Sequence, residues 1–124
     1  IFVDLGHAGL AAMIRERDFL HDLRALAGRA RSMHLWNTIG PEHTENNHHT
    51  PLHPSQLPAD GWLDIEAAVH TVLERAPGCF LVYEYPVAGV SAEIQQGYDW
   101  MEGIAEPYRA YRKHRQRCDT ASEG

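Results

Sequence analysis

Three apolar stretches of this chain each contain a side chain that can bind a metal ion. Asp4 lies in the opening run, His34 lies within Ser32–Trp36, and Glu84 lies near the end of Cys79–Tyr85. Two carboxylates and an imidazole suit a divalent cation such as Mn, Co, Mg or Zn, and three protein ligands leave positions open for substrate and water. These residue types predict a catalytic metal site, provided that the fold brings them together.

The stretch Cys79–Tyr85 is a short apolar and aromatic run, which is typical of a buried strand. Alternation along a strand places Phe80, Val82 and Glu84 on one face. Burying an unpaired carboxylate on such an apolar face would cost roughly several kcal/mol. We therefore expect Glu84 to have a partner, which is a metal ion, a cation or a shared proton.

Each of the three apolar runs is followed by a loop and then by a helical pattern. Gly6 and Gly9 suit a tight loop after the first run, and apolar spacing predicts a helix, in one or two pieces, over Ala8–Ala27. Asp64 and Ser91 are the expected N-caps of two later helices. Because active sites of parallel α/β folds collect at the carboxyl ends of the strands, we expect an α/β fold with Asp4, His34 and Glu84 at one edge.

The stretch Asn37–Trp62 shows no periodicity, and we expect a loop without regular structure. Long loops inside compact domains are usually functional or disordered, and the density of histidines favours function. No Lys or Arg occurs between Arg31 and Arg75, so a phosphate-rich ligand would find few cations there. The histidines of this stretch are His43, His48, His49 and His53.

The 124 residues, 44% of them hydrophobic, predict one folded domain, expected to span residues 1–118, with a polar tail over residues 119–124. The formal net charge of -6 disfavours non-specific nucleic-acid binding. No apolar run approaches the roughly 20 residues of a membrane span, so we expect no membrane partner and a cytoplasmic location.

Cys79 and Cys118 lack metal-site spacing and are expected to be ordinary thiols. Because Ile1 opens inside an apparent strand, we expect a fragment of a longer protein.

The motifs VDLGH, MHLWN, ADGWLD and VYEYP, in this order, resemble the last three strand–helix units of the xylose isomerase-like TIM barrels. This superfamily contains sugar phosphate isomerases and epimerases and the endonuclease IV-like enzymes. The resemblance implies the C-terminal portion of a (β/α)8 barrel, with three βα units and with Asp4, His34 and Glu84 as metal ligands. It also implies that His7 contacts substrate or a second metal, and that a further metal-binding Glu lies on an earlier strand.

The same resemblance implies a metal-dependent isomerase or epimerase that acts on a sugar or polyol-type substrate by proton transfer through an enediolate. Glu84 would act as acid or base, because a metal-bound carboxylate can move a proton while the cation stabilises the developing negative charge. His7 is the second catalytic candidate, and His7, Trp36 and His53 are the candidate substrate contacts. The expected partner is a small-molecule sugar, and homo-oligomerisation stays open.

Two other interpretations stay open. One is an endonuclease IV-like DNA-repair nuclease, whose relatives carry an Asp-x-His pair in the loop after the histidine strand. The nearest pairs here are Asn46 with His48 and Asn47 with His49, and asparagine is a poorer ligand. Epimerases often place an Arg in the same loop, which has none here. The other interpretation is a barrel relative that binds a carbohydrate or a partner without turnover.

Overall fold

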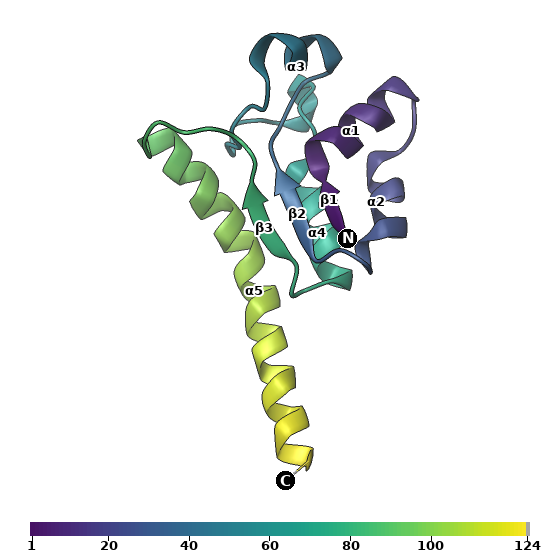
Figure 1. Ribbon diagram of the computed structural model, residues 1–124, viewed down its shortest axis with the longest axis vertical. Helices are drawn as coiled ribbons and strands as arrows, with labels where there is room; N and C mark the ends of the chain where they lie inside the picture. The colour runs from purple at the N-terminus through teal and green to yellow at the C-terminus, as the bar shows by residue number, and fades with distance from the viewer. Residues whose placement is uncertain (124) are drawn as a thin grey trace.

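The structure, a computed structural model, describes residues 1–123, with the side chains of residues 1–110. Three short parallel strands form one sheet in the order β1-β2-β3 (Figure 1). Its described elements, in chain order, are β1 (Phe2–Asp4), α1 (Leu5–Ile14), α2 (Phe19–Ala27), β2 (Ser32–Leu35), α3 (Pro41–Asn47), the 3-10 turn η1 (Pro58–Asp60), α4 (Ile65–Arg75), β3 (Phe80–Tyr83) and α5 (Ala92–Glu123). The expected α/β class and the three strand–helix units are therefore confirmed.

Parallel pairing brings the carboxyl ends of the three strands to the same edge of the sheet. Asp4 pairs with His34, and His34 pairs with Val82, so these positions form one row across the sheet. Glu84 follows β3, and its N–H donates to the carbonyl of Leu35 at 3.1 Å. Glu84 is two residues after Val82, so its side chain lies on the face of the sheet that carries Asp4 and His34, just beyond the row towards the carboxyl ends of the strands.

One face of the sheet packs on helices and forms the core. Val3, Met33 and Leu35 alternate onto this face and are buried, and Figure 1 shows α4 behind the sheet. Asp64 is the N-cap of α4, as expected, and its side chain accepts a hydrogen bond from the N–H of Ala67 at 3.1 Å. Each fully buried aliphatic side chain contributes about 1.5–3 kcal/mol, so this face holds the three strands in place.

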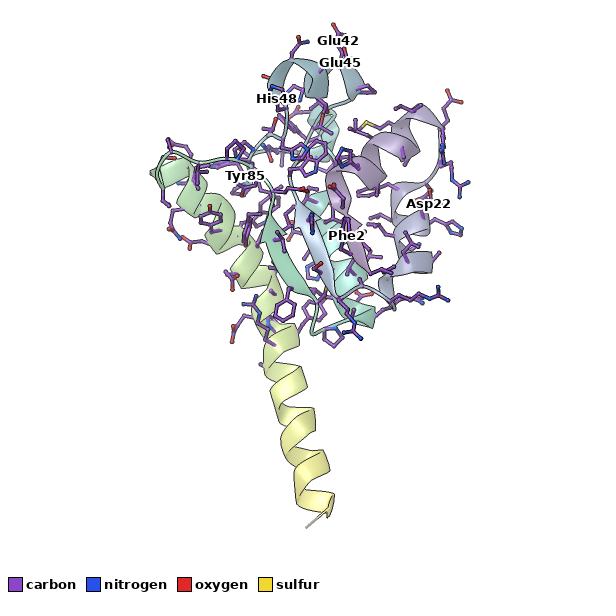
Figure 2. All side chains as sticks on the ribbon, in the orientation of Figure 1. Phe2, Asp22, Glu42, Glu45, His48 and Tyr85 are labelled. Carbon is purple, nitrogen blue, oxygen red and sulfur yellow. The ribbon has the colours of Figure 1, made fainter. Side chains whose placement is uncertain are left out.

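The other face of the sheet is open within the part of the chain that the structure describes. Phe80 is 73% exposed, Phe2 62% and Val82 40%, and Figure 2 shows Phe2 with no helix in front of it. The expectation that Phe80, Val82 and Glu84 line a buried face is therefore wrong. Alternation correctly predicted that these three side chains share one face of the sheet. The described helices do not cover that face.

Helix α1 begins directly after β1, without the expected loop. Asp4 ends the strand and caps the helix, because its side chain accepts a hydrogen bond from the N–H of His7 at 2.9 Å. Gly6 and Gly9, expected in a loop, lie inside the helix. A Cβ at Gly6 would collide with the indole of Trp36, so the glycine allows a close approach rather than a turn.

The stretch Asn37–Trp62, expected to lack regular structure, contains α3 and η1. The N–H of Asn37 donates to the carbonyl of Thr50 at 2.9 Å, which closes the first half of this segment at its base. Helix α3 buries none of its side chains. It therefore has no apolar stripe, which is why periodicity did not reveal it.

Helix α5 begins after Ser91, whose Oγ accepts a hydrogen bond from the N–H of Ile94 at 3.2 Å, as expected for an N-cap. The helix runs to Glu123 and so continues across the expected boundary between residues 1–118 and 119–124. Gly124 and the side chain of Cys118 lie outside the described residues. Among the helices that the structure describes, none combines the length and the apolar character of a membrane span.

Candidate metal centre

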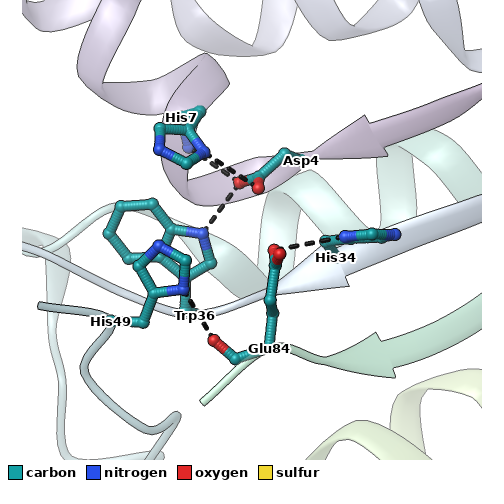
Figure 3. A network of polar contacts seen from close by, with 6 residues as sticks. All are labelled: Asp4, His7, His34, Trp36, His49 and Glu84. Atoms are coloured by element: carbon teal, nitrogen blue, oxygen red, sulfur yellow. Dashed lines mark hydrogen bonds and ion pairs between the residues drawn. The ribbon is translucent and has the colours of Figure 1, made fainter.

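The side chains of Asp4, His34 and Glu84 meet at the carboxyl edge of the sheet (Figure 3). One candidate ligand atom from each lies within 4.8 Å of the other two, and Nδ1 of His34 is 3.2 Å from Oε2 of Glu84. Metal–ligand bonds of about 2.0–2.2 Å place opposite ligands at most about 4.4 Å apart. The three side chains can therefore reach one ion with small adjustments.

The cluster is open to solvent on one side. The side chain of Asp4 is 14% exposed, that of His34 23% and that of Glu84 40%. Phe2 stacks on the ring of His34, with ring centroids 4.6 Å apart, and holds the imidazole in place. A small molecule approaching from the open face of the sheet would meet Glu84 first.

Asp4 is the most strongly held member of the cluster. Its Oδ1 accepts hydrogen bonds from the backbone N–H of His7 and from Nε1 of Trp36, the latter at 2.8 Å. Burial by itself would raise the pKa of Asp4, but the hydrogen bonds from His7 and Trp36, with the contact to Glu84, lower this pKa below its ordinary value. Asp4 is therefore an oriented carboxylate at neutral pH.

His7 lies beside Asp4 in the first turn of α1, and its ring is exposed. Nδ1 of His7 is 2.9 Å from Oδ2 of Asp4. Because a carboxylate only accepts hydrogen bonds, Nδ1 carries a proton, and the neutral form of the ring has its lone pair on Nε2. The structure thus brings His7 next to the three candidate ligands and leaves one nitrogen for a ligand or a proton.

Trp36 also lies at the cluster, but it is fully buried, with 0% exposure. Its indole N–H is used on Asp4, and the ring packs against α1 at Gly6. A side chain with no exposed surface cannot touch a substrate, so the expectation that Trp36 is a substrate contact is corrected. Its role is to orient the Asp4 carboxylate.

His49 is a further member of this network, although the sequence indicated it only as part of the pair of Asn47 and His49 and not as a candidate site residue. Its Nδ1 lies 2.7 Å from the main-chain carbonyl oxygen of Glu84. Its ring stacks on Trp36, with centroids 4.1 Å apart and planes 9° apart, and meets the ring of His7 edge-on at 5.6 Å. The sequence held two signals for His49, the histidine density of the stretch and the pair of Asn47 and His49, and neither distinguished it from His48, which pairs with Asn46.

Asn46, Asn47 and His53, which also lie in this stretch, make their hydrogen bonds outside the cluster. The side-chain amides of Asn46 and Asn47 donate to carbonyls inside α3, those of Glu42 and His43. His53 contacts Ser55 Oγ through Nδ1 at 2.7 Å and Gln96 Oε1 through Nε2 at 2.6 Å, and neither partner belongs to the cluster. The role of His53 as a substrate contact stays a prediction.

No protein-family model, no curated protein and no solved structure matches this chain. The fold and the site define an α/β protein that has two carboxylates and an imidazole at the carboxyl edge of a parallel sheet.

Proposed function

We propose that this chain belongs to a metal-dependent (β/α)8 enzyme that isomerises or epimerises a sugar or polyol-type substrate. The observation that carries the proposal is the convergence of Asp4, His34 and Glu84 from three neighbouring parallel strands, with one ligand atom of each within 4.8 Å of the others. Strand ends of this kind are where enzymes with parallel α/β folds place their catalytic groups.

Asp4, His34 and Glu84 would hold a divalent ion. The positive charge of this ion would polarise a carbonyl and a neighbouring hydroxyl of the substrate. Glu84 is the most exposed of the three and moves the proton on the carbon beside the carbonyl. His7, with its free Nε2, takes or gives a proton on a substrate hydroxyl. Trp36 keeps Asp4 ionised and aimed at the ion.

The barrel architecture is supported by the open face of the sheet. Phe2, Phe80 and Val82 are exposed apolar side chains on a three-stranded parallel sheet, and parallel sheets ordinarily have both faces covered. In the proposal, further strands of the barrel complete this face, so that these side chains line the barrel interior. The further strands also supply the remaining groups of the active site.

Metal binding to this chain tests the proposal directly. Titration calorimetry with Mn²⁺, Co²⁺, Mg²⁺ and Zn²⁺ is expected to show one site for at least one of these ions. Asp4→Asn, His34→Gln and Glu84→Gln each weaken that binding by at least tenfold, because each removes one of three ligands. Glu45→Gln removes a carboxylate on the outer side of α3 (Figure 2) and leaves the affinity unchanged. A wild-type chain that binds none of the four ions would refute the metal centre.

Turnover separates the proposed enzyme from its two rivals and is measured in the complete barrel. Deuterium exchange from solvent into the carbon beside the carbonyl of a sugar, lost in Glu84→Gln, supports the isomerase. Sugar binding without exchange favours a non-catalytic relative. Cleavage of DNA at an abasic site favours the endonuclease IV-like alternative.

A further inference from the structure

His49 contacts two parts of the candidate metal centre without being one of its three candidate ligands. We infer that His49 is a positioning residue that couples the conformation of the segment between Asn37 and Trp62 to metal binding at Asp4, His34 and Glu84. This inference rests on the proposed function, because it concerns the regulation of the same site.

The first contact fixes both the ring of His49 and the main chain at Glu84. A carbonyl oxygen only accepts hydrogen bonds, so Nδ1 of His49 must donate to the carbonyl of Glu84 across 2.7 Å. The N–H of Glu84 is bonded to Leu35 of β2, so both backbone groups of Glu84 are held. The direction in which the Glu84 side chain leaves the backbone therefore depends on His49.

The second contact reaches Asp4 through Trp36. The ring of His49 lies flat on the indole, and Gly6 of α1 closes another side of it. The indole N–H in turn holds Oδ1 of Asp4 at 2.8 Å. His49 thus acts on two of the three candidate ligands, on Glu84 through the main chain and on Asp4 through a stacked ring.

His49 lies where the flanking segment is anchored. The next residue, Thr50, accepts the hydrogen bond from Asn37 that closes the segment at its base. Helix α3, within this closed part, has no fully buried side chain, and it is held by a few contacts, chiefly the 2.6 Å hydrogen bond between Thr44 Oγ1 and Thr38 Oγ1 and the packing of His43 on Trp62. A coupling free energy is reciprocal. An ion that draws Glu84 and Asp4 together therefore also favours the conformation in which His49 contacts Trp36 and the carbonyl of Glu84, and with it the present conformation of the segment.

The affinity for Co²⁺ tests the positioning role in the full chain. Substituting a group that orients a metal ligand typically weakens affinity by about 10–100-fold, and we expect this range for His49→Ala. His49→Phe keeps the stacked ring but loses the donor, whereas His49→Gln keeps a donor but loses the ring, so each is expected to fall between His49→Ala and the wild type. His21→Ala, which removes an exposed histidine from α2, is the matched control and leaves the affinity unchanged.

Cleavage by a protease specific for glutamate reports on the segment itself. Glu42 and Glu45 lie on the outer side of α3 (Figure 2). Saturating Co²⁺ is expected to slow cleavage after these residues in the wild type, and to have no such effect in His49→Ala. A structural defect alone would raise cleavage equally with and without the ion, so this comparison separates positioning from loss of folding.

The outcomes distinguish this inference from the proposed function. If the wild type binds Co²⁺ and all three His49 variants bind it equally well, the positioning role is refuted and the metal centre stands. If the wild type binds none of Co²⁺, Mn²⁺, Mg²⁺ and Zn²⁺, the proposed function fails and the coupling fails with it. Weaker binding in His49→Ala and His49→Phe, together with loss of the protective effect of Co²⁺, establishes the coupling.

Discussion

Gly6 lies directly against the indole of Trp36, so closely that a Cβ built on the glycine would be well under 3.0 Å from three ring atoms. The first turn of α1 and the residue that follows β2 therefore touch through a residue without a side chain. Because Trp36 orients Asp4 through a hydrogen bond, this contact connects the packing of the helix to the candidate metal centre.

Gly6→Ala is expected to displace the indole of Trp36 and to destabilise the protein by about 1–3 kcal/mol, the usual range for overpacking a core. Gly28→Ala is the matched control. Gly28 has ordinary helical dihedrals, and nothing lies within 4 Å of an added Cβ, so this change stabilises by about 0.4–1 kcal/mol. Urea denaturation of both variants measures the two effects, and equal stabilities would contradict the close packing at Gly6.

Trp36→Phe retains an aromatic ring under His49 but removes the N–H that bonds Asp4. We expect a loss of stability of about 1.5–3 kcal/mol, because the hydrogen bond is to a charged group. Metal affinity should also fall about 10–100-fold, since the carboxylate loses a group that orients it. Calorimetric titration with Mn²⁺ checks this, and the control is Trp100→Phe, which changes a partly buried tryptophan of α5 that packs against the hydrophobic core. Unchanged affinity in Trp36→Phe would show that the indole does not orient Asp4.

Gly97 of α5 approaches the main chain of the segment after β2. An added Cβ would lie well under 3.0 Å from the carbonyl oxygen of Leu52, and a backbone atom cannot swing away as a side chain can. Gly97→Ala is therefore expected to destabilise by about 1–3 kcal/mol. Gly103→Ala, in the same helix with open space around the added Cβ, stabilises by about 0.5–1 kcal/mol. Thermal unfolding of the pair, followed by circular dichroism, compares the two positions in one helix.

Cys79 is buried at the start of β3, and this burial raises the pKa of its thiol from 9.0 to about 11. A thiol whose pKa is raised by folding stabilises the protein fully below the unfolded-state pKa, and this stability is lost as the pH rises towards about 11. In a Cys118→Ser background, the free energy of unfolding should therefore fall between pH 9 and about pH 11 more steeply than in the matching Cys79→Ala variant.

Alkylation of Cys79 with iodoacetamide gives an independent measure of the same burial. Because the thiolate is the reactive form, native protein at pH 8 should react at least about 100-fold more slowly than protein unfolded in urea. The Cys118→Ser background restricts the reaction to Cys79. Equal rates in the two states would show that the thiol is not protected by the fold.

Asp4, His34 and Glu84 could be predicted from the sequence because each is positioned by local rules. Alternation along a strand sets the face, and the parallel order of three strands sets the edge. The same rules failed for the exposure of Phe80 and Val82. Whether a strand face is covered depends on which element packs over it, and no pattern within the strand contains that information.

Residue types and periodicity determined the α/β class, the N-caps at Asp64 and Ser91, and the end of each strand at which a candidate ligand lies. These depend on contacts within a few residues of one another along the chain, which a sequence pattern records directly. Only the tertiary structure decided that His49 donates to the carbonyl of Glu84, 35 residues away, and that Trp36 is buried between His49 and Gly6. Such contacts depend on the path of the whole segment between Asn37 and Trp62, which local propensities do not determine because α3 has no buried face to record its position.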